Sequence, residues 1–212
     1  MKQSATKPKG ATSYKETALG IIPHSKLVQM ELEGTKNGLE YIHTLVNNNQ
    51  NTPITPHLIC ELHKVAFGWI FPTWAGAYRT IQVTFSGKEA PPYHQVSELM
   101  INFCKDIEER QKHLPSPHQE EFITQTVSLL AWLQHRFVVI HPFNDYNGRI
   151  ARMTTTLMLL KLNLPPIELK AETNTDRKRY LTAMHKADHY DSSLLEKLIG
   201  QALTEAFEHF SK

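Results

Sequence analysis

Apolar side chains recur every three or four positions through most of the chain, which is the spacing of amphipathic α-helices. The spacing is most regular between residues 121 and 140, at Ile123, Val127, Leu130, Leu133, Phe137 and Ile140. Residues 147–163 are apolar on almost every side, which predicts a helix at the centre of the core. The pattern also predicts helices over residues 25–47, 94–112, 175–186 and 192–210. An all-α fold is therefore expected.

Proline, glycine and capping residues mark where these helices begin and end. Thr55 and Pro56 suit the N-cap and first position of a further helix, which Gly68 can end. The prolines within residues 113–118 predict a linker, and Pro165-Pro166 stops the central helix.

One short stretch has strand character instead. Residues 82–85 read Gln-Val-Thr-Phe, and Ser86-Gly87-Lys88 follows as a turn, which predicts a short β-hairpin that ends before Pro91-Pro92. The expected architecture is a helical bundle with one short hairpin inserted between its helices.

Length and composition indicate one soluble domain. The chain has 212 residues, of which 41% are hydrophobic and 21% charged. It has no run of about eighteen apolar residues, so no membrane partner is expected. Residues 1–20 are predicted to be a disordered basic leader and residues 21–212 a single domain. Residues 1–18 carry a net charge of +3, which leaves about −1 for the rest, so nucleic acid is not an expected partner.

Cys60 and Cys104 are the only cysteines. They lack metal-ligand spacing and fit a reducing compartment, although they could still pair. We expect a cytoplasmic protein, with delivery into another cell left open. The twelve histidines are scattered and form no His-Glu-x-x-His motif, so a zinc site is not expected.

Residues 141–152, His-Pro-Phe-Asn-Asp-Tyr-Asn-Gly-Arg-Ile-Ala-Arg, carry most of the candidate chemistry. They lie where one predicted helix ends and the next begins, and a helix N-terminus attracts anions. Arg149 and Arg152 are three positions apart and share a helix face. The segment also holds an imidazole, which suits a general base, and a carboxylate, which suits a hard cation. This combination predicts a nucleotide-transfer site.

The same segment resembles the signature of the Fic (filamentation induced by cyclic AMP) family, His-Pro-Phe-x-(Asp/Glu)-Gly-Asn-Gly-Arg-x-x-Arg. Upstream, Trp74–Thr80 resembles the family's Trp-Ala-Gly-x-x-Arg segment, and the hairpin falls where family members carry a target-docking flap. Downstream, the segment around Asn174 and Tyr180 resembles the element on the nucleotide side. The likeness spans roughly residues 25–205 and implies a Fic-type helical bundle.

This resemblance implies a protein adenylyltransferase, which moves AMP from ATP to a Tyr, Thr or Ser hydroxyl of a target protein or of itself. His141 would be the general base and Asp145 the Mg²⁺ ligand. The flap would dock the target by backbone pairing, although an incidental hairpin is the alternative. The residues expected beside the nucleotide are Asn144, Tyr146, Asn147, Gly148, Arg149, Arg152 and Tyr180, and the flap residues are Gln82, Val83, Thr84 and Phe85.

Two positions depart from the family pattern. Tyr146 replaces a glycine, so transfer could be slower, changed in donor or transferred group, or lost. A Tyr146→Gly variant is expected to be at least as active as the parent. On the helix at residues 25–48, Gln29–Gly34 fits the second half of an inhibitory pattern, (Ser/Thr)-x-x-x-Glu-(Gly/Asn), which makes Glu33 the candidate to pair with Arg152.

Two alternative functions follow from the change at Tyr146. One is a catalytically silent Fic-fold protein that binds a nucleotide or a partner. The other is a relative that transfers phosphate or another phosphate-linked group, which the intact Asn147-Gly148-Arg149 run disfavours. The target protein is not evident from the sequence, and a homodimer is left open.

Overall fold

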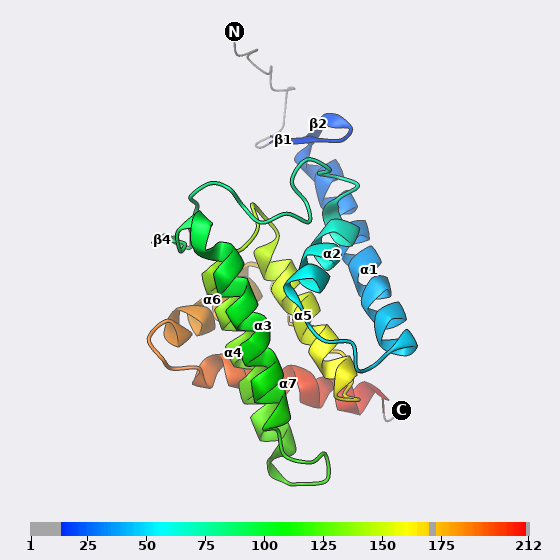
Figure 1. The fold of residues 1–212 in the computed structure, drawn as a ribbon, viewed down its shortest axis with the longest axis vertical. Coiled ribbons are helices and arrows are strands. Elements are labelled where there is room, and N and C mark those ends of the chain that lie inside the picture. Colours follow the sequence, from blue (N-terminus) through cyan, green and yellow to red (C-terminus); the bar gives the residue numbers. More distant parts are fainter. Residues whose placement is uncertain (1–13, 170–172, 211–212) are drawn as a thin grey trace.

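The computed structural model describes residues 14–169 and 173–210. Over these residues the chain forms two short hairpins, a single 3-10 turn and seven α-helices (Figure 1). The helices are α1 (His24–Asn48), α2 (Pro56–Phe67), α3 (Val96–Lys112), α4 (Glu121–Ile140), α5 (Asn147–Lys161), α6 (Asn174–Ala187) and α7 (Ser193–Phe210). The predicted all-α fold is confirmed, and each predicted helix is present with its ends shifted by a few residues at most.

Helix α5 forms the centre of the fold. It lies between the α1–α2 pair and the α3–α4 pair in Figure 1, and it packs against α1, α2 and α4. Its buried positions lie on all sides of the helix and include three consecutive threonines, Thr154, Thr155 and Thr156. The hydroxyl of Thr154 donates to the carbonyl of Ile150, so this polar group is satisfied within the helix. Helices α6 and α7 pack together, and α7 also contacts α4.

Two glycines let α1 approach its neighbours closely. A Cβ atom at Gly34 would overlap the carbonyl oxygen of Ala66 on α2. A Cβ atom at Gly38 would lie 2.8 Å from the sulfur of Met153 on α5. Because neither glycine has a side chain, the backbone of α1 lies directly against α2 and α5. This close packing places the side chains of α1 within reach of the N-terminal turn of α5.

The boundaries of α2 follow its sequence. The hydroxyl of Thr55 accepts a hydrogen bond from the Leu58 N–H at 3.1 Å, and Pro56 occupies the first helical position. Gly68 is the C-cap residue, with φ −65°, so it ends the helix without the left-handed conformation that glycine often supplies. Among the described helices, none is both long and apolar enough to cross a membrane.

The predicted disordered leader needs a correction in its last residues. Residues 1–13 lie outside the described part, but β1 (Tyr14–Thr17) pairs with β2 (Gly20–Pro23) as an antiparallel hairpin. The turn is stabilised by Thr17, whose hydroxyl accepts from Leu19 N–H and donates to the Gly20 carbonyl. The N–H of Ala18 donates to the carbonyl of Ile70 at 2.8 Å, so the hairpin is attached to the body of the domain.

Candidate functional site

The predicted motif forms a tight loop between α4 and α5. His141 ends α4 in the left-handed conformation, with φ 51°. The buried side chain of Asn147 closes the loop, because its amide oxygen accepts from Phe143 N–H and its amide nitrogen donates to the Phe143 carbonyl, both at 2.9 Å. In this structure Asn147 therefore shapes the loop rather than pointing at a phosphate. Phe143 is fully buried and anchors the loop in the core.

The imidazole of His141 has a defined orientation. Its Nδ1 lies 3.2 Å from the carbonyl oxygen of Val138, which is an acceptor, so the neutral ring carries its proton on Nδ1. The Nε2 atom is then the basic nitrogen. Burial lowers the pKa of His141 below its usual value; the Val138 carbonyl opposes this shift and the Arg79 guanidinium adds to it. The ring is therefore neutral near pH 7 and able to accept a proton.

Arg79 holds the base of the flap and the motif loop together. Its side chain is only 2% exposed, and it donates to the carbonyls of His141, Ile81 and Pro91. Its backbone N–H also donates to the Pro142 carbonyl at 2.9 Å. Residues 81 and 91 are the two ends of the flap, so one buried guanidinium fixes both ends relative to His141. Arg79 thus contacts both the flap and the motif loop.

His63 supports the loop from α2, and the sequence reasoning missed it. Its ring stacks on Phe143 with centroids 3.9 Å apart. Its Nδ1 accepts from Gly76 N–H at 2.8 Å, so its Nε2 is the donor toward the Asp145 carbonyl at 3.3 Å. Burial lowers the pKa of His63 to about 4, which keeps it neutral. His63 thereby links the Trp74–Thr80 segment to the motif; its place on the buried face of α2 was the available signal.

The N-terminal turn of α5 gathers the predicted anion-binding groups. The first helical bond runs from Ile150 N–H to the Tyr146 carbonyl, so helix geometry leaves the N–H groups of residues 147–149 without an intrahelical acceptor. A Cβ atom at Gly148 would lie 3.6 Å from Nη1 of Arg152, which places that guanidinium over the turn. A cavity of about 270 Å³ lies beside it, between α1 and α5. Its lining residues are Leu32, Thr35, Leu39, Arg149, Arg152, Met153, Thr156, Ile167, Glu168 and Leu169.

Arg152 is oriented by a chain of hydrogen bonds through the core. The hydroxyl of Tyr180, on α6, is bonded to the Arg152 side chain. It also accepts from the amide of Gln134 at 3.2 Å, and the oxygen of that amide accepts from Thr155 at 2.9 Å. Tyr180 is 7% exposed, and burial raises its pKa. The structure thus brings the predicted residue Tyr180 to the site, where it positions an arginine.

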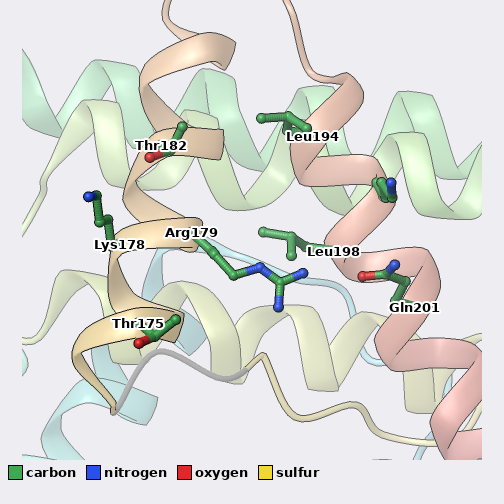
Figure 2. Close-up of a pocket in the computed structure, with 8 residues that line it drawn as sticks. Thr175, Lys178, Arg179, Thr182, Leu194, Leu198 and Gln201 are labelled. Carbon is green, nitrogen blue, oxygen red and sulfur yellow. The ribbon is translucent and has the colours of Figure 1, made fainter.

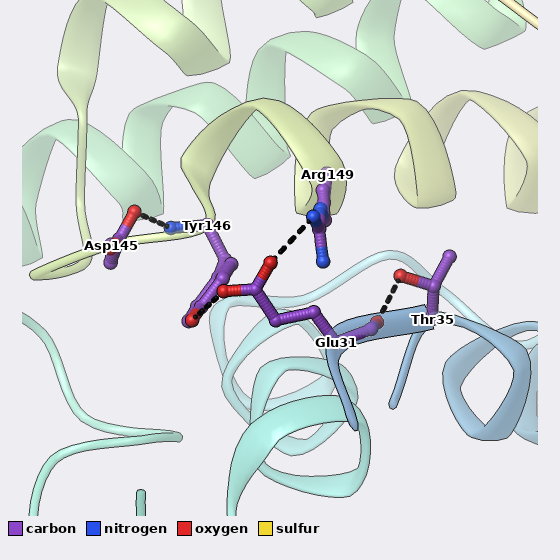
Figure 3. Close-up of polar contacts among 5 residues, drawn as sticks. All are labelled: Glu31, Thr35, Asp145, Tyr146 and Arg149. Carbon is purple, nitrogen blue, oxygen red and sulfur yellow. Dashed lines mark hydrogen bonds and ion pairs between the residues drawn. The ribbon is translucent and has the colours of Figure 1, made fainter. Parts of the chain in front are cut away.

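Arg149 is engaged by a carboxylate of α1. Its Nη2 lies 2.8 Å from Oε2 of Glu31, and the other carboxylate oxygen accepts from the Tyr146 hydroxyl at 2.6 Å (Figure 3). The Nη1 atom of Arg149 is buried and has no hydrogen-bond partner within residues 14–169 and 173–210. The predicted pairing of Glu33 with Arg152 is not formed, because Glu33 is exposed. Residues two positions apart point to nearly opposite sides of a helix, so the buried carboxylate is Glu31.

Tyr146 does not line the cavity beside Arg149 and Arg152. Its backbone is left-handed, with φ 62°, a conformation that costs a non-glycine residue about 1–3 kcal/mol. Its ring is buried away from the cavity and stacks on Phe67 with centroids 4.1 Å apart, beside Phe71 and Trp74. Aromatic packing and the bond to Glu31 offset the backbone cost. In this chain the glycine position of the family signature has a positive φ, and tyrosine adopts that conformation here with some backbone strain.

Between the buried residues Phe143 and Tyr146, the motif has two more accessible residues. Asn144 is exposed, and Asp145 is half-buried with Oδ1 accepting from the Tyr146 N–H at 2.7 Å. Over the described residues, no three His, Cys, Asp or Glu side chains form a group able to hold a metal ion. Mg²⁺ commonly needs only one or two carboxylates when phosphate oxygens complete its shell. Asp145 therefore fits Mg²⁺ as a single protein ligand beside a bound polyphosphate.

The predicted flap is a hairpin that lies directly over His141. Strand β3 (Thr84–Phe85) pairs with β4 (Lys88–Glu89), so the strand is shorter than predicted. Val83 extends the pairing, because its carbonyl accepts from the Ala90 N–H, and the Gln82 amide donates to the Ala90 carbonyl. Phe85 stacks on the His141 ring with centroids 4.3 Å apart and planes 9° from parallel. Lys88 forms an ion pair with Asp188 beyond the end of α6.

A second cavity, which the sequence did not indicate, lies between α6 and α7 and has a volume of about 330 Å³. Its lining combines two leucines with three basic side chains, and Figure 2 shows Arg179 of α6 reaching across the gap toward α7. Arg179 is adjacent in sequence to Tyr180, which faces the motif. The lining residues are Thr175, Lys178, Arg179, Thr182, Leu194, Lys197, Leu198 and Gln201.

Known proteins resemble this chain in sequence and in fold. The Protein adenylyltransferase Fic of Nematostella vectensis is 30% identical over 177 residues, which cover 83% of this chain and 38% of that protein. The chain thus spans about two fifths of the length of that relative. Among solved structures, a Fic domain containing signaling protein from Bacteroides thetaiotaomicron has a TM-score of 0.69 at 22% identity, covering 84% of this chain and 69% of that one.

The fold similarity extends to an effector of similar length. The BepC protein of Bartonella tribocorum, solved with bound AMPPNP, has a TM-score of 0.61 at 20% identity and covers 92% of this chain and 94% of its own. At these identities the solved structures support the fold alone. The family model described as Fic/DOC family matches residues 53–159, which contain α2, the flap, α3, α4 and almost all of α5. The chain therefore belongs to the Fic/DOC family.

Proposed function

We propose that this chain is a protein adenylyltransferase, which transfers AMP from ATP to a hydroxyl group of a target protein. The observation that carries this proposal is the position of a neutral, oriented His141 at one end of a loop whose other end is a helix N-terminus with Arg149 and Arg152. Relatives that match 83% of the chain are named protein adenylyltransferases, which supports the same activity.

His141 acts as the general base. The Val138 carbonyl holds the proton on Nδ1, so Nε2 takes the proton of a Tyr, Thr or Ser hydroxyl. The hydroxyl oxygen forms a bond to the α-phosphorus of ATP while the bond to the β-phosphate oxygen breaks. Pyrophosphate leaves, AMP stays on the target, and His141 keeps the proton until it passes to solvent. The lowered pKa of His141 keeps the ring in the accepting form at neutral pH.

The phosphates bind at the start of α5. The free N–H groups of this turn, including that of Gly148, donate to phosphate oxygens, and the absence of a side chain there allows close approach. Arg149 and Arg152 contact the β- and γ-phosphates through charge-assisted hydrogen bonds. Asp145 would hold Mg²⁺ together with those phosphates, where the ion would neutralise developing charge. Asn147 acts indirectly, by closing the loop.

The flap positions the target. A strand of the target pairs with the backbone of residues 82–85, as extended peptides commonly do at a short sheet edge. Phe85 lies on the His141 ring, so a segment docked on β3 would be held beside the base. The protein itself is a candidate target.

Cys60 and Cys104 are free thiols, which supports a cytoplasmic location. A homodimer remains a prediction.

Regulation by α1 also belongs to this proposal. We propose Glu31, rather than Glu33, as the inhibitory residue, because its carboxylate accepts a hydrogen bond from Nη2 of Arg149. An incoming polyphosphate must displace this buried carboxylate to reach the guanidinium. The same observation favours a second candidate function, in which the protein binds a nucleotide without transferring AMP. In that case Glu31 would stay on Arg149 whether or not the nucleotide is bound.

Incubation with ATP labelled on the α-phosphate, in the presence of Mg²⁺, tests the proposal. We expect label on the protein itself or on a protein of a cell lysate, and no label with the His141→Ala variant. A Glu31→Gln variant tests whether inhibition hides the activity, since it keeps the shape of the side chain and removes its charge. Absence of label with both the parent and Glu31→Gln, when both bind ATP, would favour the binding protein without transfer.

A further inference from the structure

Tyr146 connects the motif loop to α1. Its backbone belongs to the loop that precedes α5, while its ring lies among the aromatic side chains of the segment from α2 to Trp74. Its hydroxyl reaches Glu31 on α1 at 2.6 Å. The ring is not among the residues that line the cavity beside Arg149 and Arg152. Tyr146 therefore contacts the partner of Arg149 instead of the space that a polyphosphate would enter.

Glu31 depends on both of its partners. Its side chain is only 10% exposed, and its two carboxylate oxygens are bonded to Tyr146 on one side and to Arg149 on the other (Figure 3). A buried carboxylate that loses one partner is strongly destabilised, because nothing replaces the lost hydration. Burial and the neighbouring carboxylate of Glu31 raise the pKa of Tyr146, so its hydroxyl keeps the proton that it donates.

The orientation of Arg149 follows from this bridge. One of its terminal nitrogens faces Glu31, and the other is buried and has no hydrogen-bond partner among the residues that the structure describes. The guanidinium also lies 5.5 Å from the centre of the Tyr146 ring, within the range of a cation–π contact. Both the ring and the hydroxyl of Tyr146 thus favour the arrangement in which Arg149 faces α1 and its carboxylate.

We propose that Tyr146 is a positioning residue that holds Glu31 on Arg149 and so limits the access of polyphosphate to that arginine. This inference rests on the proposed function, in which Arg149 binds the β- or γ-phosphate of ATP. Without the tyrosyl hydroxyl, one oxygen of Glu31 is left buried and unpaired. The pair of Glu31 with Arg149 then competes less well against phosphate. The effect passes through Glu31, because Tyr146 does not line the cavity beside Arg149 and Arg152.

The test measures binding of Mg²⁺–ATP and of AMP by calorimetry to the parent and to the Tyr146→Phe, Glu31→Gln and doubly substituted proteins. A hydrogen bond to a charged group has a strength that corresponds to about a tenfold change in an equilibrium constant or more. We therefore expect Tyr146→Phe to bind ATP about tenfold more tightly and AMP with unchanged affinity, since AMP lacks the outer phosphates. Glu31→Gln should bind ATP at least as tightly as Tyr146→Phe.

The double variant separates positioning from direct contact. We expect it to bind ATP with the affinity of Glu31→Gln alone, because the hydroxyl has no charged group left to hold. A further tenfold gain in the double variant, or weaker ATP binding by Tyr146→Phe, would overturn the proposal. Glu33→Gln is the matched control, since Glu33 is exposed on the same helix and should leave both affinities unchanged.

The outcomes also distinguish this inference from the proposed function. If neither the parent nor any variant binds ATP, the proposed function fails. If all of them bind ATP with the same affinity, the nucleotide site stands and the role of Tyr146 is refuted. Tyr146→Phe keeps the buried ring, and circular dichroism checks that each protein is folded. Glu31→Gln leaves the ring of Tyr146 unchanged, so it tests the contact between Tyr146, Glu31 and Arg149 by changing Glu31 instead.

Discussion

Acid should destabilise this protein through His63 before most of its carboxylates are protonated. His63 is fully buried, and its pKa is about 4, whereas a histidine in an unfolded chain titrates near 6.5. Between these values the unfolded chain binds a proton that the folded protein does not. Stability therefore falls as the pH drops from about 6.5 to about 4, and it is insensitive to this residue above that range.

The size of the effect follows from the shift in pKa. One pKa unit corresponds to about 1.4 kcal/mol, so the whole shift lowers the free energy of unfolding by about 3 kcal/mol. At pH 5, where the unfolded imidazole is mostly protonated and the folded one is not, the loss is about 2 kcal/mol. Because small domains have a total stability of only about 5–15 kcal/mol, this loss is measurable.

Urea unfolding at pH 7.5 and pH 5 gives the free energy of unfolding of the parent and of His63→Gln, whose side chain is neutral at both values. The parent should lose about 2 kcal/mol more than the variant between the two conditions. This comparison does not depend on how much the substitution destabilises the protein at pH 7.5. An equal loss in the parent and in His63→Gln would refute the lowered pKa.

Three further substitutions test the architecture around the site. Arg79→Met leaves three carbonyls without their buried donor, so the free energy of unfolding, measured in urea, should fall by about 3 kcal/mol or more. A smaller loss would contradict the role of Arg79 in joining the flap to the motif loop. Gly34→Ala should cost about 1–3 kcal/mol by the same assay, because its Cβ overlaps Ala66, whereas Gly200→Ala meets open space and should be neutral or stabilising. Tyr146→Gly loses its aromatic packing and should be about 2–4 kcal/mol less stable, after relief of the backbone strain. At low temperature its transfer of label should nevertheless equal or exceed that of the parent. Loss of transfer by the folded variant would contradict this expectation.

The sequence predicted the helices well because their signals are local. The apolar spacing of residues 123–140 and the capping pair Thr55-Pro56 each depend on neighbours along the chain, and α4 and α2 formed where they indicated. The motif likewise placed His141 and the two arginines around one helix junction. The flap was found at the right place, with a shorter strand than expected, because hairpin pairing in so few residues depends on contacts outside the strand.

The parts that the sequence did not predict depend on packing between distant segments. Glu33 fits a family pattern, but the face of α1 that meets α5 carries Glu31, and only the docking of the helices decides between them. Tyr146 replaces the glycine of the family pattern, and the sequence alone did not show that its ring turns into an aromatic cluster formed by α2 and the segment after it. The one signal for His63 was its place on the buried face of α2, and a single histidine on an apolar helix face has many ordinary explanations.

The central claim is that the α4–α5 junction transfers the α-phosphate of ATP, as AMP, to a protein hydroxyl. Parallel reactions with ATP labelled on the α-phosphate or on the γ-phosphate test it most directly, with Glu31→Gln included to remove inhibition. The account predicts that protein acquires the α-label and that the γ-label leaves as pyrophosphate, in a reaction that requires His141. Transfer of the γ-label to protein, or α-labelling that persists in His141→Ala, would contradict it.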